Sequence, residues 1–124
     1  MGQVMTGVVT TVMHDTADLE QAVAFWTAVL GLEVVHREAN YAYLGRLGGD
    51  ESPRLAFQQV PEARTTKNRL HLDVRVPDRA AFEQHVVALG GTVLGEHQEA
   101  DFPVWTVCAD PEGNPFCIYE VPED

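Results

Sequence analysis

The hydrophobic residues between positions 18 and 31 recur at the spacing of one helix face. They fall three or four residues apart, at Leu19, Ala22, Val23, Trp26, Val29 and Leu30. Such a stripe is typical of an amphipathic helix that packs against a core. Asp18 precedes the stripe as an N-cap with Gln21 three residues further on, and Gly31 follows it where a left-handed cap is favoured. The pattern predicts a helix between Asp18 and Gly31.

A second segment repeats this order 59–60 residues later. Asp78 precedes a stripe formed by Phe82, Val86 and Leu89, and Gly90 ends it. A strand-like stretch comes before each helical segment, an apolar one over Val8–Met13 in the first copy and an alternating one over Leu70–Val74 in the second. Duplication of one unit is the simplest explanation.

Short apolar and alternating runs predict three strands after each helix. The runs are Glu33–Arg37, Tyr41–Arg46 and Arg54–Val60 in the first copy, and Thr92–Leu94, Val104–Cys108 and Pro115–Glu120 in the second. We therefore expect an α+β fold in which two βαβββ modules form a curved mixed-sheet cup with the helices on its outer face. The modules span 7–60 and 69–121, the linker spans 61–68, and together they make one domain over 1–124.

The strand predicted over 68–76 has two chemically different faces. One face carries aliphatic side chains that should pack under the helices, at Leu70, Leu72, Val74 and Val76. The other carries His71, Asp73 and Arg75. Because unpaired charge is costly to bury, this polar face must meet water or a ligand. The inside of the cup is therefore the candidate binding site.

Composition narrows the function classes. Eight Lys and Arg against 19 Asp and Glu give a net charge of -11, which disfavours binding to nucleic acid or to an anionic membrane surface. No apolar run approaches the roughly 20 residues that span a bilayer. The first seven residues lack the basic segment of a signal peptide. We expect a cytoplasmic protein with Cys108 and Cys117 as thiols.

Three motifs resemble the glyoxalase / bleomycin-resistance / extradiol-dioxygenase superfamily, also called vicinal oxygen chelate, and most closely its glyoxalase-like subgroup. They are Asp18–Gly31, Lys67–Asp73 and Asp110–Cys117. The resemblance covers nearly the whole chain and implies the fold. It does not specify an activity, because the superfamily includes isomerases, lyases, dioxygenases, resistance enzymes and metal-free drug-binding proteins. Members often pair, so we also expect a homodimer.

Metal-using members of this superfamily place ligands on the first and last strands of each half, where a divalent ion acts as a Lewis acid. The matching positions here are Thr11, Ala56 with Gln58 on the same face, His71 and Cys117. Only His71 keeps the usual ligand type. We therefore favour no metal cofactor, with a divalent ion (Zn, Ni, Mn or Fe) on His71 and Cys117 as the alternative.

Two nearby residues are possible substitute ligands. We expect His14 to lie past the end of its strand and Glu120 to lie on the face opposite Cys117, so neither completes the set. His71 itself is a candidate acid or base because histidine titrates near neutrality. The alternative is a structural histidine that a neighbour such as Asp73 or Gln58 satisfies. Residues i and i+2 of a strand lie about 6.5–7 Å apart, so we expect a water or another partner rather than Asp73.

The predicted strand faces supply a set of candidate ligand-binding residues. It comprises Thr11, Tyr43, Gln58, His71, Asp73, Trp105, Cys117 and Tyr119. Aromatic walls suit a flat organic ligand, although core packing explains each aromatic residue equally well, and we assign Trp26 to the core. Three basic residues cluster in the linker region, Arg64, Lys67 and Arg69. They attract an anionic ligand to the mouth of the cup, form salt bridges with a partner subunit, or are simply solvated.

The hypothesis we prefer is a protein that binds a small, partly aromatic organic molecule in the cup without the usual divalent metal. A metal-dependent lyase, isomerase or dioxygenase that uses His71 is the alternative. A third possibility is metal-free acid–base catalysis in which His71 carries the proton.

Overall fold

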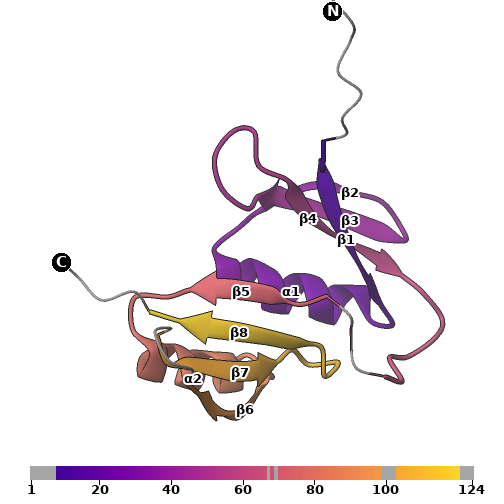
Figure 1. The fold of residues 1–124 in the computed structure, drawn as a ribbon. Coiled ribbons are helices and arrows are strands. Elements are labelled where there is room, and N and C mark those ends of the chain that lie inside the picture. The colour runs from indigo at the N-terminus through magenta and orange to yellow at the C-terminus, as the bar shows by residue number, and fades with distance from the viewer. Residues whose placement is uncertain (1–7, 67, 69, 99–102, 121–124) are drawn as a thin grey trace, which may run out of the picture.

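The computed structural model describes residues 8–66, 68, 70–98 and 103–120, and it contains two modules of the same topology (Figure 1). The elements of the first module are β1 (Thr11–Thr16), α1 (Leu19–Leu30), β2 (Val34–Arg37), β3 (Tyr41–Arg46) and β4 (Arg54–Gln59). Its strands form the first sheet, in the spatial order β1-β4-β3-β2. Strand β1 runs parallel to β4, and the other neighbours are antiparallel.

The second module repeats this arrangement. Its elements are β5 (Leu72–Arg75), α2 (Arg79–Ala88), β6 (Thr92–His97), β7 (Trp105–Ala109) and β8 (Pro115–Tyr119). They form the second sheet, in the order β5-β8-β7-β6, again with one parallel pair. The predicted α+β fold with two βαβββ modules is confirmed. Neither helix in the described residues is long and apolar enough to cross a membrane.

Both helices begin at the predicted N-caps. The carboxylate of Asp18 accepts a hydrogen bond from the backbone N–H of Gln21 at 3.1 Å, and Asp78 accepts one from Ala81 at 3.0 Å. Gly31 ends α1 with a φ of 66°, a left-handed conformation that glycine adopts without steric cost. Local capping chemistry therefore fixes the helix bounds that the sequence predicts.

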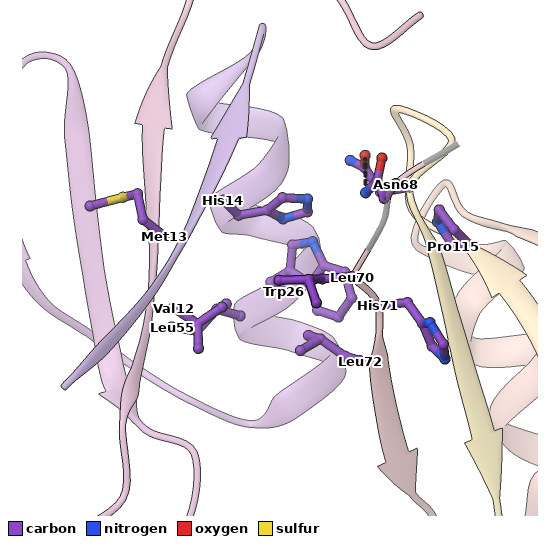
Figure 2. A pocket seen from close by; sticks show the side chains of 11 residues that line it. Val12, Met13, His14, Trp26, Leu55, Asn68, Leu70, His71, Leu72 and Pro115 are labelled. Carbon is purple, nitrogen blue, oxygen red and sulfur yellow. Dashed lines mark hydrogen bonds between the residues drawn. The ribbon is translucent and has the colours of Figure 1, made fainter. Parts of the chain in front are cut away.

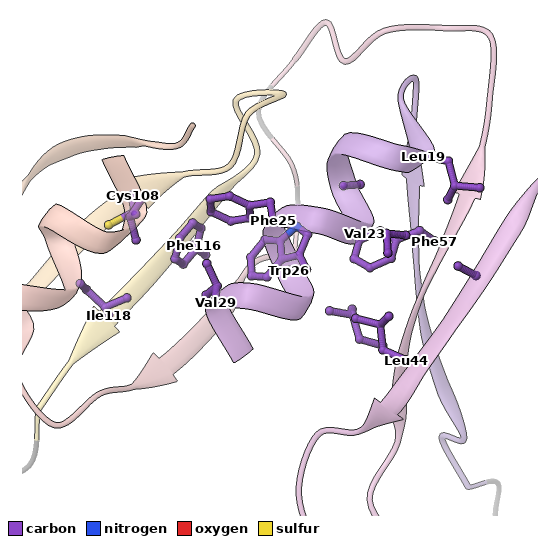
Figure 3. Packing of buried hydrophobic residues seen from close by; sticks show 14 of the residues in the cluster. Leu19, Val23, Phe25, Trp26, Val29, Leu44, Phe57, Cys108, Phe116 and Ile118 are labelled. Atoms are coloured by element: carbon purple, nitrogen blue, oxygen red, sulfur yellow. The ribbon is translucent and has the colours of Figure 1, made fainter. Parts of the chain in front are cut away.

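Helix α1 joins the two modules into one hydrophobic core (Figure 3). Leu19 and Val23 face the first sheet, where Phe57 and Leu44 are buried. Further along the helix, the Phe25 and Trp26 rings contact Phe116 of β8, with ring centroids 6.0 and 5.0 Å from it. Figure 1 shows the same placement, with α1 between the two sheets and α2 against the second sheet. The core is continuous across the module boundary.

Strand β1 differs from the expected apolar stretch. It starts at Thr11 and continues to Thr16, in register with β4 from Arg54 to Gln59. Val8 and Val9 are apolar but exposed, because they precede this pairing. The prediction that His14 lies past the strand end is therefore wrong.

Candidate functional site

A buried carboxylate organises the turn between β7 and β8. Asp110 is 3% exposed, and its two oxygens accept four hydrogen bonds. The donors are the Glu112 and Asn114 backbone N–H groups, the Asn114 side-chain amide, and the indole N–H of Trp26 at 3.2 Å. The predicted turn is present, since Gly113 N–H bonds to the Asp110 carbonyl at 2.8 Å. Through Trp26 this turn also holds helix α1 of the other module.

Glu112 makes a second tie between the modules. One carboxylate oxygen accepts the Thr16 hydroxyl, and the other accepts the Ala17 backbone N–H at 2.9 Å. Thr16 is itself buried, at the junction of β1 and α1. The turn of the second module is therefore fastened to the start of α1 in the first.

A row of side-chain amides leads from this turn to the linker. The Asn114 amide N–H donates to Asp110 at 2.9 Å. The Asn68 amide N–H donates to the Asn114 carbonyl oxygen at 3.0 Å, and Arg64 Nε donates to the Asn68 carbonyl oxygen at 3.2 Å. Polar side chains thus run continuously from the linker to the buried carboxylate.

A cavity of about 400 Å³ lies between β1 and β5 (Figure 2). Its surface is mostly apolar, and we call it the apolar cavity. Four polar side chains reach it: His14, Asn68, His71 and Asn114. The remaining lining residues are Val12, Met13, Trp26, Leu55, Leu70, Leu72 and Pro115. Its volume is within the range of pockets that hold small organic molecules, about 300–1,000 Å³.

His14 contributes to this cavity from the middle of β1. Its ring lies 5.6 Å from the Phe57 ring and 6.3 Å from the Trp26 ring, measured between centroids. Alternation along β1 explains the placement, because Val12, His14 and Thr16 turn toward the helix side. His14 is therefore a wall residue of the apolar cavity.

A second hollow of about 510 Å³ adjoins the apolar cavity and shares four of its residues, Met13, His14, Asn68 and Asn114. We call it the polar hollow. Its other lining residues are Val60, the linker residues 62–66, Asp15 and Glu112. Of the predicted basic cluster, Arg64 lines the hollow, whereas Lys67 and Arg69 lie outside the described residues.

His71, Asp73 and Cys117 come together beside the apolar cavity. One potential ligand atom from each lies within 4.8 Å of the other two. His71 Nε2 is 3.2 Å from an Asp73 carboxylate oxygen, so the expectation of a water or another partner is wrong. The strand spacing does not apply, because β5 begins only at Leu72 and His71 precedes it. Cys117 on β8 is directly opposite Asp73 in the parallel register.

Comparison with known families identifies this architecture. The family described as glyoxalase-like domain matches residues 11–119, which includes every helix and strand of the structure. The chain belongs to the glyoxalase-like domain family. Comparison with curated protein sequences gives no significant match.

Solved structures share the fold of this glyoxalase-like domain at low sequence identity. A glyoxalase/bleomycin resistance protein/dioxygenase family enzyme from Burkholderia phytofirmans PsJN is 19% identical, with a TM-score of 0.77 over 94% of this chain and 100% of that one. A fosfomycin resistance protein, FosX, from Listeria monocytogenes is 12% identical, with a TM-score of 0.76 over 94% and 90%. A lactoylglutathione lyase from Agrobacterium tumefaciens is 18% identical, with a TM-score of 0.67 over 94% and 95%.

The cluster in this glyoxalase-like domain fits a zinc ion in its donor chemistry. The Listeria FosX structure is a complex with Mn(II), an ion that prefers oxygen ligands. Here the donors are one imidazole nitrogen, one carboxylate oxygen and one thiol sulfur. Three such ligands with an open fourth position are typical of catalytic zinc sites. Glu120 is not part of the cluster, because its carboxylate accepts the Arg79 backbone N–H at 3.0 Å.

The predicted ligand-binding residues of the first half lie on the first sheet. Thr11, Tyr43 and Gln58 alternate with buried residues that face α1, so they lie on the sheet face away from the helix. None of the three lines the apolar cavity or the polar hollow. Their role in ligand binding stays a prediction.

The predicted residues of the second half lie on the corresponding face of the second sheet. Trp105 and Tyr119 are directly opposite each other on β7 and β8, and the His97 ring stacks on Trp105 with centroids 5.8 Å apart. Asp73 and Cys117 share this face and form the cluster with His71. Of all eight predicted residues, only His71 lines the apolar cavity.

Sequence reasoning missed four residues of the apolar cavity that matter for its chemistry, namely His14, Trp26, Asn68 and Asn114. Trp26, Asn68 and Asn114 lie in the motifs that carry the family resemblance, but their contacts are tertiary. The available signal for Asn114 was its place directly after the Asp110–Gly113 turn, and the signal for Asn68 was its place in the Lys67–Asp73 motif.

Proposed function

We propose that this glyoxalase-like domain binds a small, partly aromatic organic molecule in the apolar cavity, without requiring a divalent metal. The cavity itself carries the proposal: about 400 Å³ of mostly apolar space with a few polar groups at its wall. The His14 ring supplies aromatic surface for a flat ligand, and the buried Trp26 ring lies at the cavity wall. The family and the fold agree with a binding role but leave the ligand open.

The experiment uses Trp26 as a reporter within the cavity. The chain has two tryptophans, so a nitrogen–proton correlation spectrum has two indole signals, which Trp105→Phe assigns. We expect neutral aromatic probes (phenol, indole, acetophenone and α-methylstyrene) to shift the Trp26 signal at millimolar concentration and leave Trp105 in place. If none of the probes shifts Trp26, the proposal is wrong.

A pair of matched variants locates the binding. Leu70 lines the cavity and is 84% exposed, so Leu70→Trp should narrow the entrance without disturbing the core. We expect it to weaken probe binding at least tenfold in calorimetry. Leu94→Trp makes the same change at a 60% exposed position of β6 outside the cavity and should leave binding unchanged. Equal affinity of the two variants would place the ligand elsewhere.

The His71, Asp73 and Cys117 cluster favours a second candidate function, a metal-dependent lyase, isomerase or dioxygenase. A bound divalent ion would act there as a Lewis acid on a substrate oxygen. His71 would hold the ion and also line the apolar cavity, so an ion at the cluster would sit beside a bound molecule.

Titration of the purified protein with zinc, nickel, manganese and iron(II) by calorimetry tests this candidate. It predicts one zinc per chain, bound at least tenfold more weakly after Cys117→Ser. Cys108→Ser is the matched control, because Cys108 lies outside the cluster. If none of the four metal ions binds stoichiometrically, the hypothesis of a metal-dependent enzyme is wrong and the metal-free proposal stands.

A further inference from the structure

The hydrogen-bonded row from the linker to the buried turn has a fixed direction. At one end, the Asp110 carboxylate can only accept hydrogen bonds. At the other end, the Arg64 guanidinium can only donate them. The two amides between these ends, Asn68 and Asn114, must therefore both orient the same way, as their contacts show.

This direction determines which groups the amides present. Each amide nitrogen carries two hydrogens. Asn114 uses one for Asp110, and Asn68 uses one for Asn114. Within the part of the chain that the structure describes, neither second hydrogen has a protein acceptor. Both side chains line the apolar cavity, where Figure 2 labels Asn68. The two amides therefore present a pair of hydrogen-bond donors at its wall.

Three other polar groups line the cavity, and the first of them is the His14 ring, which lies near the Phe57 and Trp26 rings. The indole N–H of Trp26 is engaged by Asp110, so the tryptophan offers the cavity only ring surface. His71 Nε2 is engaged by Asp73. The apolar residues contribute no polar side-chain atoms. At the two amides, a ligand acceptor meets an unused N–H, whereas each amide oxygen is already bonded to one protein donor.

We propose that Asn68 and Asn114 determine specificity by donating hydrogen bonds to an acceptor oxygen on the ligand, a carbonyl or a carboxylate, whose apolar part fills the cavity. This inference rests on the proposed binding function and narrows its ligand class. Asp110 and Arg64 are positioning residues, because they act by holding the two amides in one orientation.

A pair of isosteric probes tests the inference. Acetophenone and α-methylstyrene share one shape, but only acetophenone has a carbonyl oxygen where the other has a methylene group. We expect acetophenone to bind about five- to tenfold more tightly, the effect of one or two hydrogen bonds. Benzoate, measured alongside, tells a preference for carboxylate from one for carbonyl.

The variant Asn68→Asp replaces the donor with an acceptor at constant shape. Because one of the two donors is removed, it should lower the preference for acetophenone over α-methylstyrene at least twofold, while α-methylstyrene binds as before. Asn40→Asp makes the same substitution at an exposed position outside both hollows and should keep the preference. Thermal melts of both variants check that they are folded.

The outcomes separate this inference from the proposed function. If both probes bind the unmodified protein with equal affinity, Asn68 and Asn114 do not select ligands with an acceptor oxygen, and the inference is wrong. The proposed binding function then still stands. If Asn68→Asp keeps the full preference for acetophenone, the assignment to Asn68 is wrong. If neither acetophenone nor α-methylstyrene binds, the inference is wrong, and the proposed function fails too if phenol and indole also leave the Trp26 signal in place.

Discussion

At the scale of single residues, the two cysteines show how a sheet gives neighbouring side chains different chemistry. Cys108 pairs across β7 and β8 with Phe116 and is fully buried on the helix side. Cys117 is opposite Val107 and lies on the other face, in the cluster with His71. Both are thiols, as expected. Burial is the main cause that raises the pKa of Cys108 from 9.0 to about 11, and the charges of Glu83 and Cys117 add to it.

This pKa predicts a loss of stability at alkaline pH. The folded protein keeps the Cys108 proton to a higher pH than the unfolded chain does, so ionisation favours unfolding. The contribution of protonated Cys108 to the free energy of unfolding is fully present below pH 9.0 and is lost as the pH rises to about 11. In urea unfolding over this range, we expect the stability difference between the unmodified protein and Cys108→Ala to shrink. Cys117→Ala should lose nearly as much stability with pH as the unmodified protein, because burial is the main cause of the raised pKa of Cys108. A constant difference for Cys108→Ala would contradict the assignment.

The sequence predicts some site residues and misses others for a physical reason. His71 was identified because strand alternation is local and places it opposite the aliphatic residues. The role of Asn68 depends on a contact with Asn114, 46 positions away, which no local pattern encodes. The contact of His71 with Asp73 was missed because the expected spacing assumes that both residues lie in the strand, whereas β5 begins at Leu72, after His71.

At the scale of elements, one arginine fastens α2 to the second sheet. Arg79 is the first residue of the helix, and its Nη1 donates to Glu96 of β6 at 2.7 Å and to the Thr106 hydroxyl of β7 at 2.8 Å. The Thr106 hydroxyl donates in turn to Glu83 at 3.0 Å, and Thr106 is fully buried. Removing the arginine therefore leaves the buried Thr106 hydroxyl without its hydrogen-bond donor, Arg79 Nη1.

We therefore expect Arg79→Met to lower the free energy of unfolding by about 2 kcal/mol, within the range for breaking a buried network. The methionine keeps most of the apolar stem, so lost packing contributes little. Arg37→Met is the control, because Arg37 pairs with the exposed carboxylate of Glu20 and such pairs contribute at most about 1 kcal/mol. Equal effects in urea denaturation would show that the Arg79 network does not stabilise the fold.

Helices and strands differ in how far the sequence alone predicts them. Asp18, Asp78 and Gly31 set the helix ends through contacts within a few residues, so the helix bounds were predictable. The bounds of β1 depend on its pairing with β4 more than 40 positions away, from Thr11 opposite Arg54 to Thr16 opposite Gln59. The apolar pattern alone predicted that this strand starts at Val8, whereas β1 starts at Thr11.

At the scale of the whole molecule, the two modules share one core although each repeats the same topology. Helix α1 contributes Phe25 and Trp26 to a ring cluster with Phe116 of the second sheet. The hydrogen bonds that Asp110 accepts from Trp26 and that Glu112 accepts from Ala17 cross the same boundary between the modules. Because the apolar cavity lies between the modules, its shape depends on both remaining folded together.

A substitution deep in one module should therefore destabilise the other. Leu44 is fully buried in β3 of the first sheet, and Leu44→Ala is expected to cost about 2–5 kcal/mol. In a Trp26→Phe background, the fluorescence of Trp105 in β7 reports on the second module alone. If the modules unfold as one unit, Leu44→Ala moves the Trp105 transition to lower urea by the same amount as the transition in far-ultraviolet circular dichroism. A Trp105 transition that stays in place would mean that the second module is stable alone, and that the cavity can open without global unfolding.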